Sequence, residues 1–153
     1  MKLYLLRHGE PLPESKDPER SLTSRGELDI AIIGRFLEQN ELFVPEIWHS
    51  EKRRVRQTAE IIGQATGCVS LLERPGLAPL DPVGPVRAEI LGREEDLMLV
   101  GHLPFLPRLA EQLLGCPREN SIFRFETGEI VCLERNGEGT WQLLFVVCPR
   151  LLE

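Results

Sequence analysis

The sequence offers little that would build a metal centre, a disulfide framework or a surface for polyanions. Its four cysteines lie far apart without a Cys-x-x-Cys pair, so neither a zinc site nor a disulfide framework is indicated. We expect them to be small buried hydrophobes in a reducing compartment. The formal net charge of −6 disfavours nucleic acid or an anionic membrane as the main partner.

Long hydrophobic runs are also missing. The first apolar run, residues 3–6, ends at Arg7 and is too short for a signal-peptide core or a membrane span. We therefore expect a cytosolic protein. A chain of 153 residues corresponds to one domain, residues 1–153, and is long enough to bury one sheet with helices around it.

Four short, mostly apolar segments predict parallel strands covered on both faces: residues 2–7, 46–49, 68–72 and 96–101. Helical patterns lie between them. Ser24 and Glu27 form a capping box for the first helix, and Ser50 can cap a second helix that Gly67 ends. A weaker third helix is expected over residues 83–92. A fourth opens at Pro104 and ends before Gly115.

The C-terminal part predicts a different geometry. Asn136-Gly137-Glu138-Gly139 separates two apolar runs, residues 130–133 and 141–147, which is typical of a β-hairpin. The expected fold is thus a three-layer α/β/α domain whose mainly parallel sheet gains an antiparallel C-terminal hairpin. The Pro-rich loops at residues 11–18 and 77–85 are expected to border the site.

Two predicted strands end at a histidine beside a glycine, in Arg7-His8-Gly9 and in Gly101-His102. Open α/β sheets bind ligands at the carboxyl ends of their strands. A neutral imidazole is a nucleophile toward phosphorus, and with an unperturbed pKa of ~6.5 much of His8 is neutral at pH 7. Its other nitrogen needs a fixed acceptor, most simply a backbone carbonyl.

Phosphoryl chemistry also requires positive charge at fixed positions. Arg7 adjoins His8, and Arg54 lies in the first turn of the predicted second helix, where free backbone N–H groups favour an anion. A guanidinium binds two phosphate oxygens at once. Arg53 and Arg56, in the same basic run, are expected to form a solvated face.

Four motifs occur in an order and spacing that resemble the histidine phosphatase (phosphoglycerate mutase-like) superfamily. They are Arg7-His8-Gly9-Glu10, Ser21-Leu22-Thr23-Ser24-Arg25-Gly26, Ser50-x-x-x-Arg54-x-x-Gln57-Thr58-Ala59 and Val100-Gly101-His102. The short length, residues 101–105, and a C-terminal pattern through Cys116-Pro117, Phe123 and the hairpin resemble the SixA-type phosphohistidine phosphatases. Glu51 stands where relatives often carry proline.

The resemblance implies that His8 accepts the phosphoryl group, that Arg7 and Arg54 clamp it, and that His102 is a cationic partner opposite His8. We expect His102 to be charged when phosphate is bound and partly neutral in the empty site. No metal or other cofactor is implied. No ligand spacing around the histidines supports a metal.

The sequence lacks a clear general acid for an ester leaving group. Asp81, Glu73 and Glu10 are the nearby carboxylates. Phosphohistidine loses an imidazole, a far better leaving group than an alkoxide, so it needs a placed acid less. We therefore expect a monomeric phosphatase that acts on a phosphohistidine-carrying protein, either a phosphotransfer domain of a two-component relay or a phosphocarrier. Two alternatives stay open: a small-molecule phosphomonoesterase of the same superfamily, and a non-catalytic phosphohistidine-binding module.

Overall fold

The computed structural model describes residues 1–116 and 119–153, and a six-stranded sheet forms its middle layer. The strands lie in the order β3-β2-β4-β1-β5-β6. The first four in chain order pair in parallel, and β5 and β6 add an antiparallel pair next to β1. This confirms the predicted sheet with its C-terminal hairpin. The strands are β1 (Lys2–Arg7), β2 (Glu46–His49), β3 (Ser70–Glu73), β4 (Leu97–Gly101), β5 (Ile130–Arg135) and β6 (Trp141–Val147).

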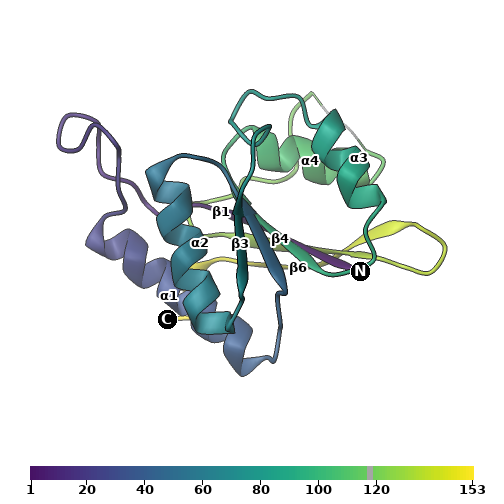
Figure 1. The fold of residues 1–153 in the computed structure, drawn as a ribbon, viewed down its shortest axis with the longest axis horizontal. Coiled ribbons are helices and arrows are strands. Elements are labelled where there is room, and N and C mark those ends of the chain that lie inside the picture. The colour runs from purple at the N-terminus through teal and green to yellow at the C-terminus, as the bar shows by residue number, and fades with distance from the viewer. Residues whose placement is uncertain (117–118) are drawn as a thin grey trace.

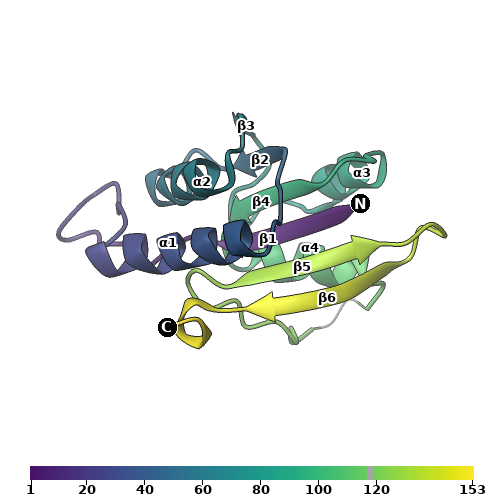
Figure 2. The ribbon, with the colours of Figure 1, turned by 90° about the horizontal axis from the view of Figure 1, so that it is seen from below.

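Helices cover both faces of the sheet, as Figures 1 and 2 show. One face packs against α1 (Ser24–Gln39) and α2 (Arg53–Thr66), and the other against α3 (Gly84–Leu91) and α4 (Phe105–Leu113). A short 3-10 helix, η1 (Pro149–Leu151), follows β6. The sheet separates two hydrophobic cores, one on each of its faces.

The central strand β1 is apolar at every position from residue 3 to residue 6. Leu3 and Leu5 belong to the core under α3 and α4, while Tyr4 and Leu6 belong to the core under α1 and α2. All four are at most 1% exposed. A strand buried on both faces has no polar side, which is the expected signature of a parallel strand between helical layers.

Two predicted helix starts are wrong by one or two residues. Thr23, not Ser24, is the N-cap of α1, because its hydroxyl oxygen accepts a hydrogen bond of 2.9 Å from the Gly26 N–H. Ser50 does not cap α2, whose N-cap is Lys52 with no side-chain capping bond. The Ser50 hydroxyl is instead engaged with a histidine, as described below.

The remaining boundaries agree with the sequence pattern to within two residues. Gly67 ends α2 in the left-handed conformation at φ 67°. Cys68 then donates its N–H to the carbonyl of Gly63, so β3 begins at Ser70 rather than at Cys68. Of the C-terminal pattern noted above, Pro117 lies outside the described residues. No helix within the described ranges is long and apolar enough to cross a membrane.

The start of α1 packs directly on the loop after β1. A Cβ atom added at Gly26 would lie 2.4 Å from the carbonyl oxygen of Glu10 and 2.9 Å from its nitrogen. At Gly9 it would lie 2.9 Å from the carbonyl oxygen of Gly26. The two glycines therefore allow two backbone segments to approach closely beside His8.

We expect Gly26→Ala to lower the free energy of unfolding by about 1–3 kcal/mol, because its methyl group meets backbone atoms that cannot rotate away. Urea denaturation measures this. The matched control is Gly84→Ala in the first turn of α3, where nothing lies within 4 Å of an added Cβ. Alanine favours a helix over glycine there, so the control should be neutral or slightly stabilising. Equal effects of the two substitutions would contradict the close approach.

Candidate active site

The two histidines at the strand ends meet because β1 and β4 are neighbours in the sheet. Arg7 lies in register with Gly101, and the His8 N–H donates to the Gly101 carbonyl at 3.2 Å. The ring centroids of His8 and His102 are 5.4 Å apart in an edge-on arrangement. The structure thus brings the residues predicted from two distant motifs to one point of the sheet edge.

The His8 ring has one nitrogen committed and one available. Its Nδ1 lies 2.7 Å from the carbonyl oxygen of Gly9. Because a carbonyl only accepts, Nδ1 carries the proton and Nε2 keeps its lone pair. The Arg54 Nε–H donates to Nε2 at 3.4 Å, a long and weak bond that a ligand can replace. The acceptor expected from the sequence is therefore present.

Both imidazoles are held in the neutral form. Burial, reinforced by the cations of Arg54 and Arg7, lowers the pKa of His8 to about 3, although the hydrogen bond to Gly9 opposes this shift. Burial and then the charge of Arg54 lower the pKa of His102 to about 4. At neutral pH, the imidazoles of His8 and His102 are therefore neutral, and the nearby guanidinium groups carry the positive charge of the site.

Arg7 presents an unused donor. Its Nη1 donates to the carbonyl of Phe125 at 2.7 Å, and Phe125 takes a left-handed backbone conformation at φ 49°. Its Nε is buried and has no hydrogen-bond partner among the residues that the structure describes. Burial lowers the pKa of Arg7. A buried cationic donor without a partner is costly, and an anionic ligand would satisfy it.

Arg54 is the second residue of α2, in the helical first turn that the sequence predicts. The Thr58 hydroxyl donates to the Arg54 carbonyl at 2.8 Å and accepts the Gly9 N–H at 3.1 Å. This bridge ties the start of α2 to the residue after His8. Burial, followed by the charge of Arg20, lowers the pKa of Arg54.

The other two arginines of the basic run behave as the predicted solvated face. Arg53 pairs with Glu19 at 2.8 Å and Arg56 with Glu73 at 3.1 Å, and both arginines are exposed. Exposed pairs of this kind contribute little to stability. They nevertheless leave these guanidinium groups less available to a ligand than that of Arg54.

Sequence reasoning missed two polar residues that position the site. Ser50 is fully buried, and its Oγ shares a hydrogen bond of 2.8 Å with His102 Nε2. Thr58 carries the bridge between Gly9 and Arg54. Both residues belong to the Ser50-x-x-x-Arg54-x-x-Gln57-Thr58 motif. The available signal was a polar side chain at two buried positions, one after a strand and one within a helix.

The three carboxylates considered as general acids are occupied elsewhere. Glu10 accepts the Thr23 hydroxyl at 2.7 Å, which ties the loop after β1 to the cap of α1. Asp81 accepts the Ala78 N–H at 2.9 Å within its own loop, and Glu73 pairs with Arg56 at 3.1 Å. None of the three makes a hydrogen bond with His8 or His102.

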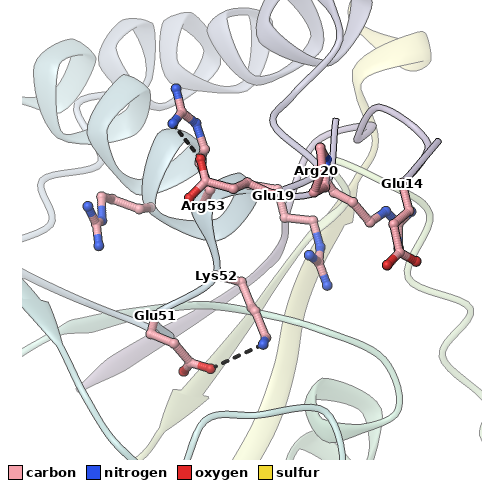
Figure 3. Close-up of a pocket in the computed structure, with 9 residues that line it drawn as sticks. Glu14, Glu19, Arg20, Glu51, Lys52 and Arg53 are labelled. Atoms are coloured by element: carbon pink, nitrogen blue, oxygen red, sulfur yellow. Dashed lines mark hydrogen bonds and ion pairs between the residues drawn. The ribbon is translucent and has the colours of Figure 1, made fainter. Parts of the chain in front are cut away.

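A polar hollow of about 460 Å³ opens beside Arg54 and is drawn in Figure 3. The 13–20 loop forms one wall and the start of α2 the other. Across residues 1–116 and 119–153, no group of three or more His, Cys, Asp and Glu side chains is arranged to hold a metal ion. The residues that line the hollow are Glu14, Pro18, Glu19, Arg20, Glu51, Lys52, Arg53, Arg54 and Arg56.

Two phosphatases are among the solved structures that share this fold. The structure of the protein histidine phosphatase SixA complexed with tungstate superposes with a TM-score of 0.87, at 24% identity over 100% of both chains. A mycobacterial glucosyl-3-phosphoglycerate phosphatase complexed with VO3 gives 0.68, at 18% identity over 94% of this chain and 97% of that one. At these identities the similarity establishes the phosphoglycerate mutase-like fold.

Sequence comparison identifies the family. An uncharacterized protein of Picosynechococcus sp. (strain PCC 7002) is 33% identical over 120 residues, which span 74% of this chain and 73% of that protein. The model of the histidine phosphatase superfamily, branch 1, matches residues 3–82, which include three of the four motifs. The chain belongs to the histidine phosphatase superfamily.

Proposed function

We propose that this protein hydrolyses phosphohistidine on a partner protein, with His8 as the covalent nucleophile. The observation that carries the proposal is the unprotonated Nε2 of His8 beside Arg54, together with a buried Nε of Arg7 that has no hydrogen-bond partner among the described residues. Membership of the superfamily supports a phosphatase. The fold shared with SixA supports the choice of phosphohistidine as substrate class.

In the first step, the lone pair of His8 Nε2 attacks phosphorus, and the bond from phosphorus to the substrate ring breaks. The substrate ring carries a proton on its other nitrogen, so it leaves as neutral imidazole. Arg7 and Arg54 stabilise the charge on the equatorial phosphoryl oxygens. Burial and then the charge of Arg54 lower the pKa of His102, and the negative charge of the arriving dianion favours its protonation. A protonated His102 then adds a further cation opposite His8.

In the second step, water attacks the phosphoryl group on His8, the P–N bond to Nε2 breaks, and phosphate leaves. His8 Nδ1 keeps its proton throughout because the carbonyl of Gly9 accepts a hydrogen bond from it. The ring therefore returns to the starting tautomer without a rearrangement. No metal enters either step of the proposal, since the arginines supply the charge.

The substrate class follows from the leaving group. Glu10, Glu73 and Asp81 are engaged in local contacts, so an alkoxide would leave without a placed acid, whereas an imidazole leaves readily. The partner we propose is a phosphotransfer domain of a two-component relay or a phosphocarrier. The four cysteines are free, which fits a reducing cytoplasm, and we propose that a monomer suffices for the reaction.

We expect His8→Ala to keep less than about a thousandth of the wild-type rate, because losing a covalent nucleophile removes several orders of magnitude. Acid-sensitive phosphate should be trapped on the wild-type protein during turnover and be absent from the variant. Arg56→Ala serves as the control and should retain both the rate and the label. A phosphate label that persists in His8→Ala would place the intermediate elsewhere.

The neutral imidazoles predict a pH dependence of stability. Because the pKa of His102 is about 4 when folded and ~6.5 when unfolded, the unfolded chain takes up its proton first as pH falls below 6.5. Stability is therefore lost between about pH 6.5 and 4. Between pH 7.5 and 5.0, urea unfolding of His102→Gln should show about 2 kcal/mol less loss than wild type. Equal losses would mean that His102 titrates alike in both states.

The substrate class is tested by comparing rates on one preparation. We expect a phosphorylated histidine-containing protein and phosphoramidate to be hydrolysed fastest, an aryl phosphate more slowly, and a sugar phosphate slowest, in the order of leaving-group quality. Asp81→Asn should change the P–N rates by less than about twofold. If the sugar phosphate is preferred and Asp81→Asn abolishes that activity, the protein is a phosphomonoesterase. Phosphohistidine binding without turnover would indicate a binding module.

A further inference from the structure

The hollow beside Arg54 is lined by four cations that the proposed phosphoryl chemistry does not use, and one of them differs from the others. Arg53, Arg56 and Lys52 line it, and each pairs with a carboxylate; Figure 3 draws the pairs of Arg53 and Lys52 as dashed lines. Arg20 lines the same hollow and has no ion pair with any residue in 1–116 or 119–153. It is half-buried. Its charge is therefore available to a ligand.

The loop holds Arg20 in a fixed and unusual conformation. Its backbone is left-handed at φ 52°, which a long side chain rarely adopts. Asp17 produces this turn, because its carboxylate accepts the N–H groups of Glu19 and Ser21 and its carbonyl accepts that of Arg20. The Arg20 Nε donates to the Leu12 carbonyl at 3.2 Å. Neither Nη atom of Arg20 makes a hydrogen bond with the described residues, 1–116 and 119–153.

Arg20 and Arg54 line one hollow. The positive charge of Arg20 contributes to the lowered pKa of Arg54. The arginines that contribute to the lowered pKa of His8 are Arg54 and Arg7. The hollow that Arg20 and Arg54 share is lined by neither His8 nor His102. Arg54, which contacts His8 and also lines this hollow, is therefore the residue that the two regions share.

We propose that Arg20 and Arg54 bind a second anionic group of the substrate, separate from the phosphoryl group that is transferred to His8. Two guanidinium groups across one hollow suit a carboxylate or a phosphate, whose oxygens each accept from the planar forks. The proposal extends the proposed function, since Arg54 contacts both groups. The second anion is either an acidic side chain beside the phosphohistidine or a second phosphate of a small molecule.

Binding of inorganic phosphate and pyrophosphate, measured by calorimetry, tests the site independently of turnover. Pyrophosphate places a second phosphoryl group beside the first, so it should bind wild type more tightly than phosphate does. In Arg20→Asn, pyrophosphate affinity should fall by at least about tenfold, the scale of one lost charge-assisted hydrogen bond, while phosphate affinity stays within about twofold. Asparagine tolerates the left-handed backbone, so the variant should fold.

The control is Arg56→Gln, a cation on the same hollow that already pairs with Glu73. It should leave both affinities within about twofold. Arg20→Lys keeps the charge but not the planar fork, so it should recover only part of the pyrophosphate affinity. Equal weakening of phosphate and pyrophosphate in Arg20→Asn, or weakening of neither, would overturn the second site. Failure of phosphate to bind wild type at all would instead count against the proposed function.

Rates separate the two sources of the second anion. Phosphoramidate has no second anionic group, so Arg20→Asn should hydrolyse it at about the wild-type rate. If the anion is an acidic side chain, kcat/KM for a phosphorylated protein should fall at least about tenfold in Arg20→Asn and only part of that loss should appear in Arg20→Lys. If only a bisphosphate substrate is affected, the anion is a second phosphate. A lower phosphoramidate rate in Arg20→Asn would place Arg20 on the transferred phosphoryl group and overturn the proposal.

Discussion

The parallel pairing of β1 with β4 is the contact on which the site depends. It sets Arg7 opposite Gly101, lets the His8 N–H bond to the Gly101 carbonyl, and thereby places two imidazoles 5.4 Å apart. Residues separated by more than ninety positions in the chain meet only because these strands are neighbours and point the same way. Register matters here, since a shift by one residue would turn each strand-end side chain to the other face.

Burial of the histidines among arginines then sets the chemistry. Desolvation and neighbouring cations keep both rings neutral, while the Gly9 carbonyl selects the tautomer of His8. The same features leave positive charge unsatisfied at the site, because the buried Nε of Arg7 has no hydrogen-bond partner within residues 1–116 and 119–153. An entering phosphate would relieve cation repulsion and supply acceptors together. Affinity for the ligand and readiness of the nucleophile thus have one physical origin.

A second network holds the surrounding backbone in place. Thr58 bridges Gly9 and Arg54, and Glu10 holds Thr23 at the cap of α1. The glycines at positions 9 and 26 let these segments approach within contact distance of backbone atoms. The carboxylate of Glu10 therefore has a structural contact in this network. The 13–20 loop is held by separate hydrogen bonds. The Asp17 carboxylate accepts two backbone N–H groups, and the Arg20 Nε donates to the Leu12 carbonyl, so the loop holds Arg20 in place.

Local pattern was sufficient for the elements. Each signal acts over a few neighbouring residues, so the elements could be predicted from apolar runs, the Gly67 stop, the Pro104 start and the Asn136-Gly137 hairpin. The motifs also predicted that Arg7, His8, Arg54 and His102 lie near one another. Tertiary structure decided what depends on distant partners. Ser50 could cap a helix or hold His102, and only the neighbouring strand made the second bond possible. The availability of Arg20 likewise depends on Leu12, Asp17 and the start of α2. The physical reason is that the hydrogen-bond and ion-pair partners of a side chain are set by the residues packed around it, which are distant in the sequence.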